Sequence, residues 1–326
     1  MSAIMVPLDG SPFAEQALPL ALAIGRSKCS RVQLVTVRPA PFPGGEDHDR
    51  NEAYVRVLAA RVEGEHPGLI TPWVLAGRAG PMYAPQSSSD VAELLVRHAR
   101  DHEIELIVMT THGRSGVERA WLGSVADSVI RTSTRPVLLV RPGDGTPASA
   151  ADTDDVGHVL ITLDGSKTAE YAISMARRYA TADTRFTLLR VVPPLAQQLS
   201  ARGRDLYWAA YESPSSRRAA DDYLQQVAGT LREAGIVVET AVVESTSPAA
   251  VITDYADEHA VDMIALTTAG AGGMKRLFLG SVADKVVRSA RVPVLVCNAR
   301  RIGTDQIAKS AVAPARKADP ARLVHQ

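Results

Sequence analysis

The stretch MTTHGRSGVERAWLGSVAD, from Met109 to Asp127, aligns without a gap on LTTAGAGGMKRLFLGSVAD, from Leu266 to Asp284. Each copy follows a short apolar run and ends in a segment with helical spacing, with a glycine-rich loop between the two. A repeat this long exceeds a solenoid unit and indicates a duplicated domain.

Shorter matches extend the repeat outward in both directions. VPLDGS, from Val6 to Ser11, returns as ITLDGS, from Ile161 to Ser166, and RPVLLV at 135–140 returns as VPVLVC at 292–297. The segment between the copies is rich in Pro, Gly, Ala and Asp, which is typical of a linker. After the second copy the chain is polar, basic and alanine-rich, which favours disorder. We expect domains at 1–141 and 157–298, a linker at 142–156 and a disordered tail at 299–326.

Strands and helices alternate within each copy. In the first half we expect strands at 2–9, 31–37, 69–76, 104–110 and 136–140, and helices at 12–28, 52–63, 89–102 and 124–132. Short apolar strands separated by helices predict a parallel sheet covered on both faces. Each half is therefore expected to be a doubly wound α/β domain of about five strands. The second half adds a stretch at 193–216 before its second long helix.

Composition narrows the function classes. The chain has 326 residues, no net charge and a pI near 7.1, so no overall field attracts nucleic acid or an anionic membrane. We find neither a signal peptide pattern nor an apolar run long enough to span a membrane. Cys29 and Cys297 lack a cysteine at metal or redox spacing, so we expect reduced thiols in a cytoplasmic protein.

The glycine loop predicts a phosphate site. It leaves the fourth strand at its carboxyl end and enters a helix that opens with Gly123 and Ser124. A helix N-terminus offers unpaired N–H groups and partial positive charge, and we expect Ser124 to supply a donor and a capping oxygen. The other residues of the two loops that fit this role are Gly113, Gly116, Gly270, Gly273, Gly280 and Ser281. Neither the P-loop nor the G-x-G-x-x-G fingerprint is present.

Asp9 and Asp164 each end a first strand at the same edge of the sheet. A carboxylate there accepts hydrogen bonds from an adenine or a ribose. An Asx-turn or a helix cap explains the same residue equally well, so both interpretations stand.

With these motifs, both halves resemble ATP-binding universal stress protein domains. That family's motif is G-x-x-G, nine residues, then G-[ST]; here Gly113 and Gly123-Ser124, and again Gly270 and Gly280-Ser281, keep the spacing. Thr110 and Thr267 stand where the motif has its first glycine. The resemblance implies a Rossmann-like, adenine nucleotide alpha hydrolase-like fold that binds ATP together with Mg²⁺. It also implies that the final strands of the two halves pair as a pseudo-dimer, and it leaves open a homodimer of tandem chains.

The resemblance also assigns contacts. Adenine and ribose would meet Pro7, Asp9, Val37, Met109 and Thr110 in one half, and Thr162, Asp164, Val191, Leu266 and Thr267 in the other. Phosphates would meet Gly113, Gly123, Ser124 and Val125, and Gly270, Gly280, Ser281 and Val282.

The two loops differ in charge. His112 and Arg114 stand in the first loop, where the second has Ala269 and Ala271. If either side chain reaches the phosphates, the first site is the tighter one, because charged hydrogen bonds are the stronger ones. Lys275 and Arg276 of the second loop either compensate for this difference or lie on a solvated helix face. His112 is either a hydrogen-bonded loop residue or a catalytic base.

Three functions follow from these features. The first is a nucleotide-binding regulatory module of the stress response, with one or two ATP sites. The second is a slow ATPase or phosphotransfer enzyme, although no paired acidic metal ligands accompany the loops. The third is a nucleotide-free interaction scaffold.

Overall fold

The computed structural model describes residues 2–38, 47–76, 87–111, 122–142, 156–194, 216–268 and 279–298. The remaining residues include most of the predicted linker, most of the 193–216 stretch and the predicted tail.

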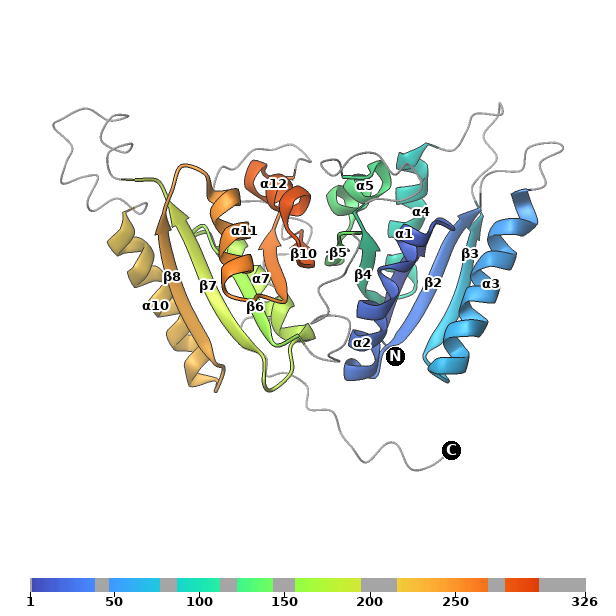
Figure 1. Ribbon diagram of the computed structural model, residues 1–326, viewed down its shortest axis with the longest axis horizontal. Helices are drawn as coiled ribbons and strands as arrows, with labels where there is room; N and C mark the ends of the chain where they lie inside the picture. The colour runs from blue at the N-terminus through green and yellow to red at the C-terminus, as the bar shows by residue number, and fades with distance from the viewer. Residues whose placement is uncertain are drawn as a thin grey trace.

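Each half is a five-stranded α/β unit, and the two units lie side by side (Figure 1). The strands of the first half are β1 (Ala3–Leu8), β2 (Arg31–Arg38), β3 (Ile70–Ala76), β4 (Ile104–Thr110) and β5 (Val137–Val140). Its helices are α1 (Pro12–Glu15), α2 (Leu18–Lys28), α3 (Asp47–Glu65), α4 (Ser88–Asp101) and α5 (Ser124–Thr132). The strands of the second half are β6 (His158–Thr162), β7 (Arg185–Val192), β8 (Val238–Glu244), β9 (Met263–Thr267) and β10 (Val294–Cys297). Its helices are α7 (Lys167–Tyr179), α10 (Arg217–Glu233), α11 (Pro248–Glu258) and α12 (Ser281–Ser289).

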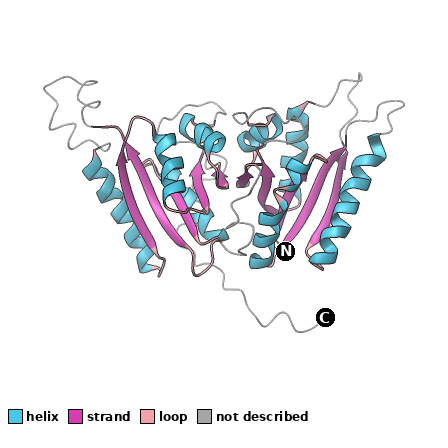
Figure 2. Cartoon of the chain, viewed as in Figure 1, coloured by secondary structure: helices cyan, strands magenta, loops and turns pink. Residues whose placement is uncertain are grey.

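The strands form one continuous sheet in the order β3-β2-β1-β4-β5-β10-β9-β6-β7-β8. Pairing is parallel within each half, and β5 and β10 join antiparallel at the centre, with Leu138 opposite Leu295 (Figure 2). The doubly wound α/β prediction is confirmed. The resemblance implied that the final strands of the two halves pair, and the β5–β10 pair joins the two five-stranded sheets into a single ten-stranded sheet.

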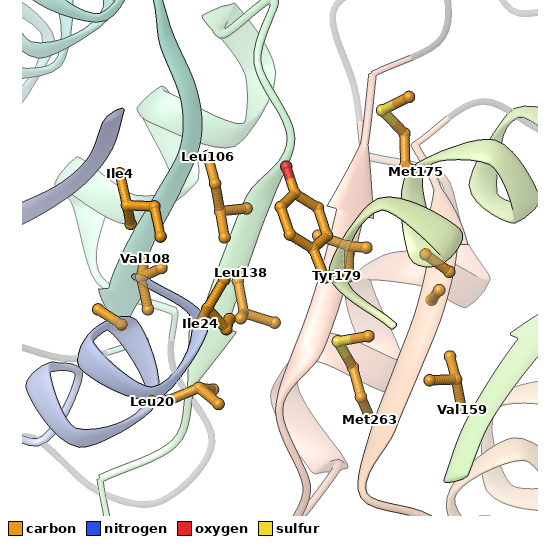
Figure 3. Packing of buried hydrophobic residues seen from close by; sticks show 14 of the residues in the cluster. Ile4, Leu20, Ile24, Leu106, Val108, Leu138, Val159, Met175, Tyr179 and Met263 are labelled. Carbon is orange, nitrogen blue, oxygen red and sulfur yellow. The ribbon is translucent and has the colours of Figure 1, made fainter. Parts of the chain in front are cut away.

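Helices cover both faces of this sheet, as strands buried on two sides require. Alternate residues of β1 face opposite sides: Ile4, Val6 and Leu8 pack with α1, α2 and α3, whereas Ala3 and Met5 pack with α4 and α5. The second half repeats this division, with α7 and α10 on one face and α11 and α12 on the other. Figure 3 shows side chains of the first face from both halves, among them Leu138 and Tyr179. The core is therefore continuous across the two halves.

Three expected helices differ in detail. The helix predicted at 52–63 is longer and runs over Asp47–Glu65. The helix predicted at 12–28 is two helices, because Pro19 sits inside it and its ring would clash with the carbonyl of Glu15, where α1 ends. The helix predicted at 89–102 begins one residue earlier, at Ser88, because Ser87 caps it and forms a capping box with Asp90. Pro72 is tolerated in β3 because β3 is an edge strand.

Contacts between the halves hold the ends of the helices. Arg141, just after β5, donates to the carbonyls of Ser289 and Ala290 at the end of α12, at 3.2 and 3.5 Å. Asn298, just after β10, donates to the carbonyl of Arg131 near the end of α5, at 3.4 Å. On the opposite face, the Tyr179 hydroxyl donates to the Glu105 carbonyl at 3.0 Å.

Among the helices of the described segments, none combines the length and the apolar character needed to cross a bilayer.

Candidate functional site

The strand order reverses between β1 and β4 in the first half and between β6 and β9 in the second. Ligands of open α/β sheets bind at the carboxyl ends of the strands at such a reversal. In this chain each reversal brings together the end of a first strand, the end of a fourth strand and the start of a nine-residue helix. These two places are the candidate sites.

The start of α5 is fixed directly to the end of β4. The N–H of Gly123 donates to the carbonyl of Thr111 at 2.7 Å, and the N–H of Thr111 donates to the carbonyl of Val140 at 2.9 Å. The second half repeats both bonds: Gly280 to Thr268 at 3.0 Å, and Thr268 to Cys297 at 3.0 Å. The start of each helix is therefore bonded to the residue that follows the fourth strand, which places the helix N-terminus at the sheet edge.

Gly123 and Gly280 are the N-caps of α5 and α12, with φ of −59° and −57°. Neither helix has a side-chain capping hydrogen bond in the described part of the chain. A Cβ at Gly280 would lie 3.2 Å from the Thr268 carbonyl oxygen, which is backbone and has little room to move. Such a start presents amide N–H groups and the positive end of the helix dipole to an anion.

The predicted capping role of Ser124 and Ser281 is wrong. Both are the first residue inside the helix, whereas only the residue before it has the geometry to cap the first amides. The Ser124 hydroxyl instead lies 2.7 Å from the hydroxyl of Ser88 at the start of α4. This contact brings the N-termini of α4 and α5 together. The sequence analysis did not predict the contact, and the SSSD run at 87–90 is the sequence feature that points to a helix start there.

Asp9 and Asp164 each close a turn after the first strand. The Asp9 carboxylate accepts from the N–H of Ser11 at 3.0 Å and from its hydroxyl at 2.6 Å. The Asp164 carboxylate accepts from the N–H of Ser166 at 2.9 Å. Gly10 and Gly165 between them have φ of 81° and 88°, the left-handed region that favours glycine. The Asx-turn interpretation is confirmed for both, and it leaves contact with a base or ribose as a separate proposal.

The predicted wall residues lie along the same edges. Pro7, Val37, Thr162 and Val191 are half-buried near the ends of their strands, and Val125 and Val282 are half-buried at the starts of α5 and α12. The side chains of Met109, Thr110 and Leu266 are buried, and that of Thr267 is half-buried. Four predicted phosphate-loop residues lie outside the described residues: Gly113, Gly116, Gly270 and Gly273. His112, Arg114, Ala269 and Ala271 lie outside them as well.

A tyrosine–carboxylate pair lies close to each Asp turn. The Tyr54 hydroxyl donates to Glu15 at 2.9 Å, and the Tyr223 hydroxyl donates to Glu170 at 3.2 Å. Burial, followed by the hydrogen bond to Glu15, raises the pKa of Tyr54 well above its usual value. Burial, followed by the charge of Glu170, does the same to the pKa of Tyr223. Both phenols therefore remain protonated donors at neutral pH.

In the described segments, no group of three His, Cys, Asp or Glu side chains is placed to hold a metal ion.

Comparison with known proteins gives consistent matches. The sequence profile described as the Universal stress protein family matches residues 1–141 and again residues 156–298. A universal stress protein of Mycobacterium tuberculosis is 27% identical over 197 residues, which are 60% of this chain and 62% of that protein. Another from the same organism is 24% identical over 312 residues, which are 90% of this chain and 94% of the relative. The chain thus spans under two thirds of the first relative and nearly all of the second.

Solved structures show the same fold. A universal stress protein from Archaeoglobus fulgidus superposes with a TM-score of 0.61 at 20% identity, covering 91% of this chain and 96% of that one. A chain from Pseudomonas aeruginosa, described as a protein of unknown function, superposes with a TM-score of 0.57 at 17% identity, covering 95% of both chains.

Proposed function

The chain belongs to the universal stress protein family, and we propose that it is a regulatory nucleotide-binding module that binds ATP in one or both halves. One observation carries the proposal: the junction of strand end, Asp turn and helix N-terminus is built twice with the same hydrogen bonds. The amide groups at the start of α5 and α12 suit phosphates, and the adjoining strand ends suit a base and a ribose.

The roles proposed for individual residues follow from these positions. Asp9 and Asp164 would meet the base or the ribose through their carboxylates, beside Val37 and Val191. Gly123 and Gly280, with the amides that follow them, would hold the phosphates, and Mg²⁺ would accompany ATP. We further propose a cytoplasmic stress-response role, which the two free cysteines, Cys29 and Cys297, support.

The test is a calorimetric titration of the purified, nucleotide-free chain with ATP and Mg²⁺. We expect one or two sites per chain, with binding lost from one half in Gly123→Val and from the other in Gly280→Val, because a branched side chain would occupy phosphate space. Gly229→Ala is the matched control: Gly229 lies within α10, and no atom lies within 4 Å of its added Cβ. Absence of ATP binding by the unaltered chain in calorimetry and in equilibrium dialysis would refute the proposal.

A further inference from the structure

β7 carries a buried charged residue among mostly apolar neighbours. Arg190 stands between Leu189 and Val191 and is only 8% exposed. The N–H of Leu163 donates to the Leu189 carbonyl at 2.9 Å, which places Arg190 beside the end of β6. The corresponding position in the first half is Thr36, which pairs with Leu8 and is 2% exposed. The equivalent position near the turn after the first strand of each half is therefore a cation, Arg190, in the second half and a neutral residue, Thr36, in the first.

The Arg190 guanidinium lies against the turn that holds Asp164. A Cβ added to Gly165 would lie 2.7 Å from its Nη2 atom and 3.0 Å from its Nη1 atom. Its other flank faces the ring of Tyr223, whose centroid is 5.2 Å from the guanidinium carbon. This distance is within the range of a cation–π contact. Glycine is needed at position 165 both for its φ of 88° and for this close approach.

Electrostatics couples this cation to Asp164. Burial lowers the pKa of Arg190, while the neighbouring Tyr223 and Asp164 act in the opposite direction. A guanidinium stays protonated in proteins, so a positive charge lies beside the Asp164 carboxylate at neutral pH. ATP carries several negative charges, and an unneutralised carboxylate at the other end of its site would repel them.

We propose that Arg190 is the positioning and charge-neutralising residue that makes the second half accept a polyanionic nucleotide. This inference rests on the proposed ATP function. The second glycine loop has Ala269 and Ala271 where the first has His112 and Arg114, and its own cations, Lys275 and Arg276, stand later in the loop. Arg190 adds positive charge at a different place, next to the Asp164 turn, and it does so by acting on Asp164 rather than by touching the phosphates.

The experiment measures the second half alone, in the full chain with Gly123→Val. ATP and adenosine are titrated separately at low and at high salt. We expect Arg190→Met to weaken ATP binding about tenfold at low salt, and less at high salt because ions screen the interaction. Adenosine, which is uncharged, should change less than about twofold on the same electrostatic reasoning. Arg190→Lys keeps the charge and should restore most of the ATP affinity.

Arg185→Thr is the matched control, since Arg185 lies on the same strand at its exposed far end. Thermal melting of each variant establishes that the fold is retained, and Met was chosen because it fills most of the buried volume of Arg.

The possible outcomes separate the two proposals. Equal losses for ATP and adenosine, no loss in Arg190→Met, or an equal loss in Arg185→Thr would each overturn the role of Arg190. An unaltered chain that binds ATP while the Gly123→Val chain does not would also overturn it, and would leave the proposed function standing. No ATP binding by the unaltered chain would refute the proposed function itself.

Discussion

At the scale of single residues, glycines are decisive for two different reasons. Gly280 has an ordinary φ, and its constraint is the space between the start of α12 and the Thr268 carbonyl. Gly165 has a left-handed φ and also lies against Arg190. Gly235 has a left-handed φ of 76°, and no atom lies within 4 Å of an added Cβ. A substitution at Gly235 therefore measures the cost of the left-handed backbone without any steric clash.

This contrast gives a prediction for stability. Gly235→Ala should lower the free energy of unfolding by about 1 kcal/mol, the cost of placing a Cβ in the left-handed region. Gly165→Ala should cost a further ~1–3 kcal/mol, because its Cβ also overpacks the guanidinium of Arg190. Urea unfolding of both variants measures the difference. Equal losses would show that Arg190 moves aside freely and that the turn is not packed against it.

At the scale of elements, α4 packs against the edge strand β3 through a cluster of rings. His98 lies in α4, His102 is its C-cap residue and Trp73 lies in β3. The His98 ring lies 5.0 Å from that of Trp73 and 4.3 Å from that of His102, and its Nε2 atom is 2.8 Å from Oε1 of Gln33. Burial, followed by the charge of His102, lowers the pKa of His98 to about 4. The packing of α4 against the sheet is therefore most stable when the His98 side chain is neutral.

The pH dependence follows from this shift. In the unfolded chain His98 takes up a proton as the pH falls below about 6.5. In the folded chain it takes up this proton only near pH 4. The contribution of His98 to stability is therefore fully present above pH 6.5 and is lost as the pH falls from 6.5 to 4, by up to about 3 kcal/mol. His98→Asn cannot titrate and should flatten this part of the curve of unfolding free energy against pH. An unchanged slope in the variant would contradict the assignment.

At the scale of the whole molecule, the two halves share one sheet and one pair of hydrophobic layers. Leu138 and Leu295 face each other across the β5–β10 pair, and both are fully buried in the same layer. Tyr179 of α7 bonds to the backbone of β4 in the other half. Since each half supplies part of the environment of the other, we expect the centre of the sheet to unfold as one unit.

Hydrogen exchange resolved by peptide tests this expectation. Leu138→Ala should cost about 2–5 kcal/mol and should raise exchange in the central strands of both halves. Leu58→Ala in α3, which packs at the outer edge of the first half, is the control and should act on that half alone. Faster exchange confined to the first half in both variants would show that the halves unfold independently.

Local sequence patterns determined the alternation of strands and helices, the duplication and the glycine at the start of α5 and α12. These features depend on the period of apolar residues and on turn chemistry, which neighbours in sequence decide. The break between α1 and α2 belongs to the same class, because Pro19 acts on the residue four positions before it.

Only the tertiary structure decided which distant segments meet. The contact of Ser88 with Ser124 and the position of Arg190 against Gly165 each depend on contacts across long stretches of chain. In the sequence, Arg190 is a charge between two apolar residues, Leu189 and Val191; the strand order and register place it against the turn that holds Asp164.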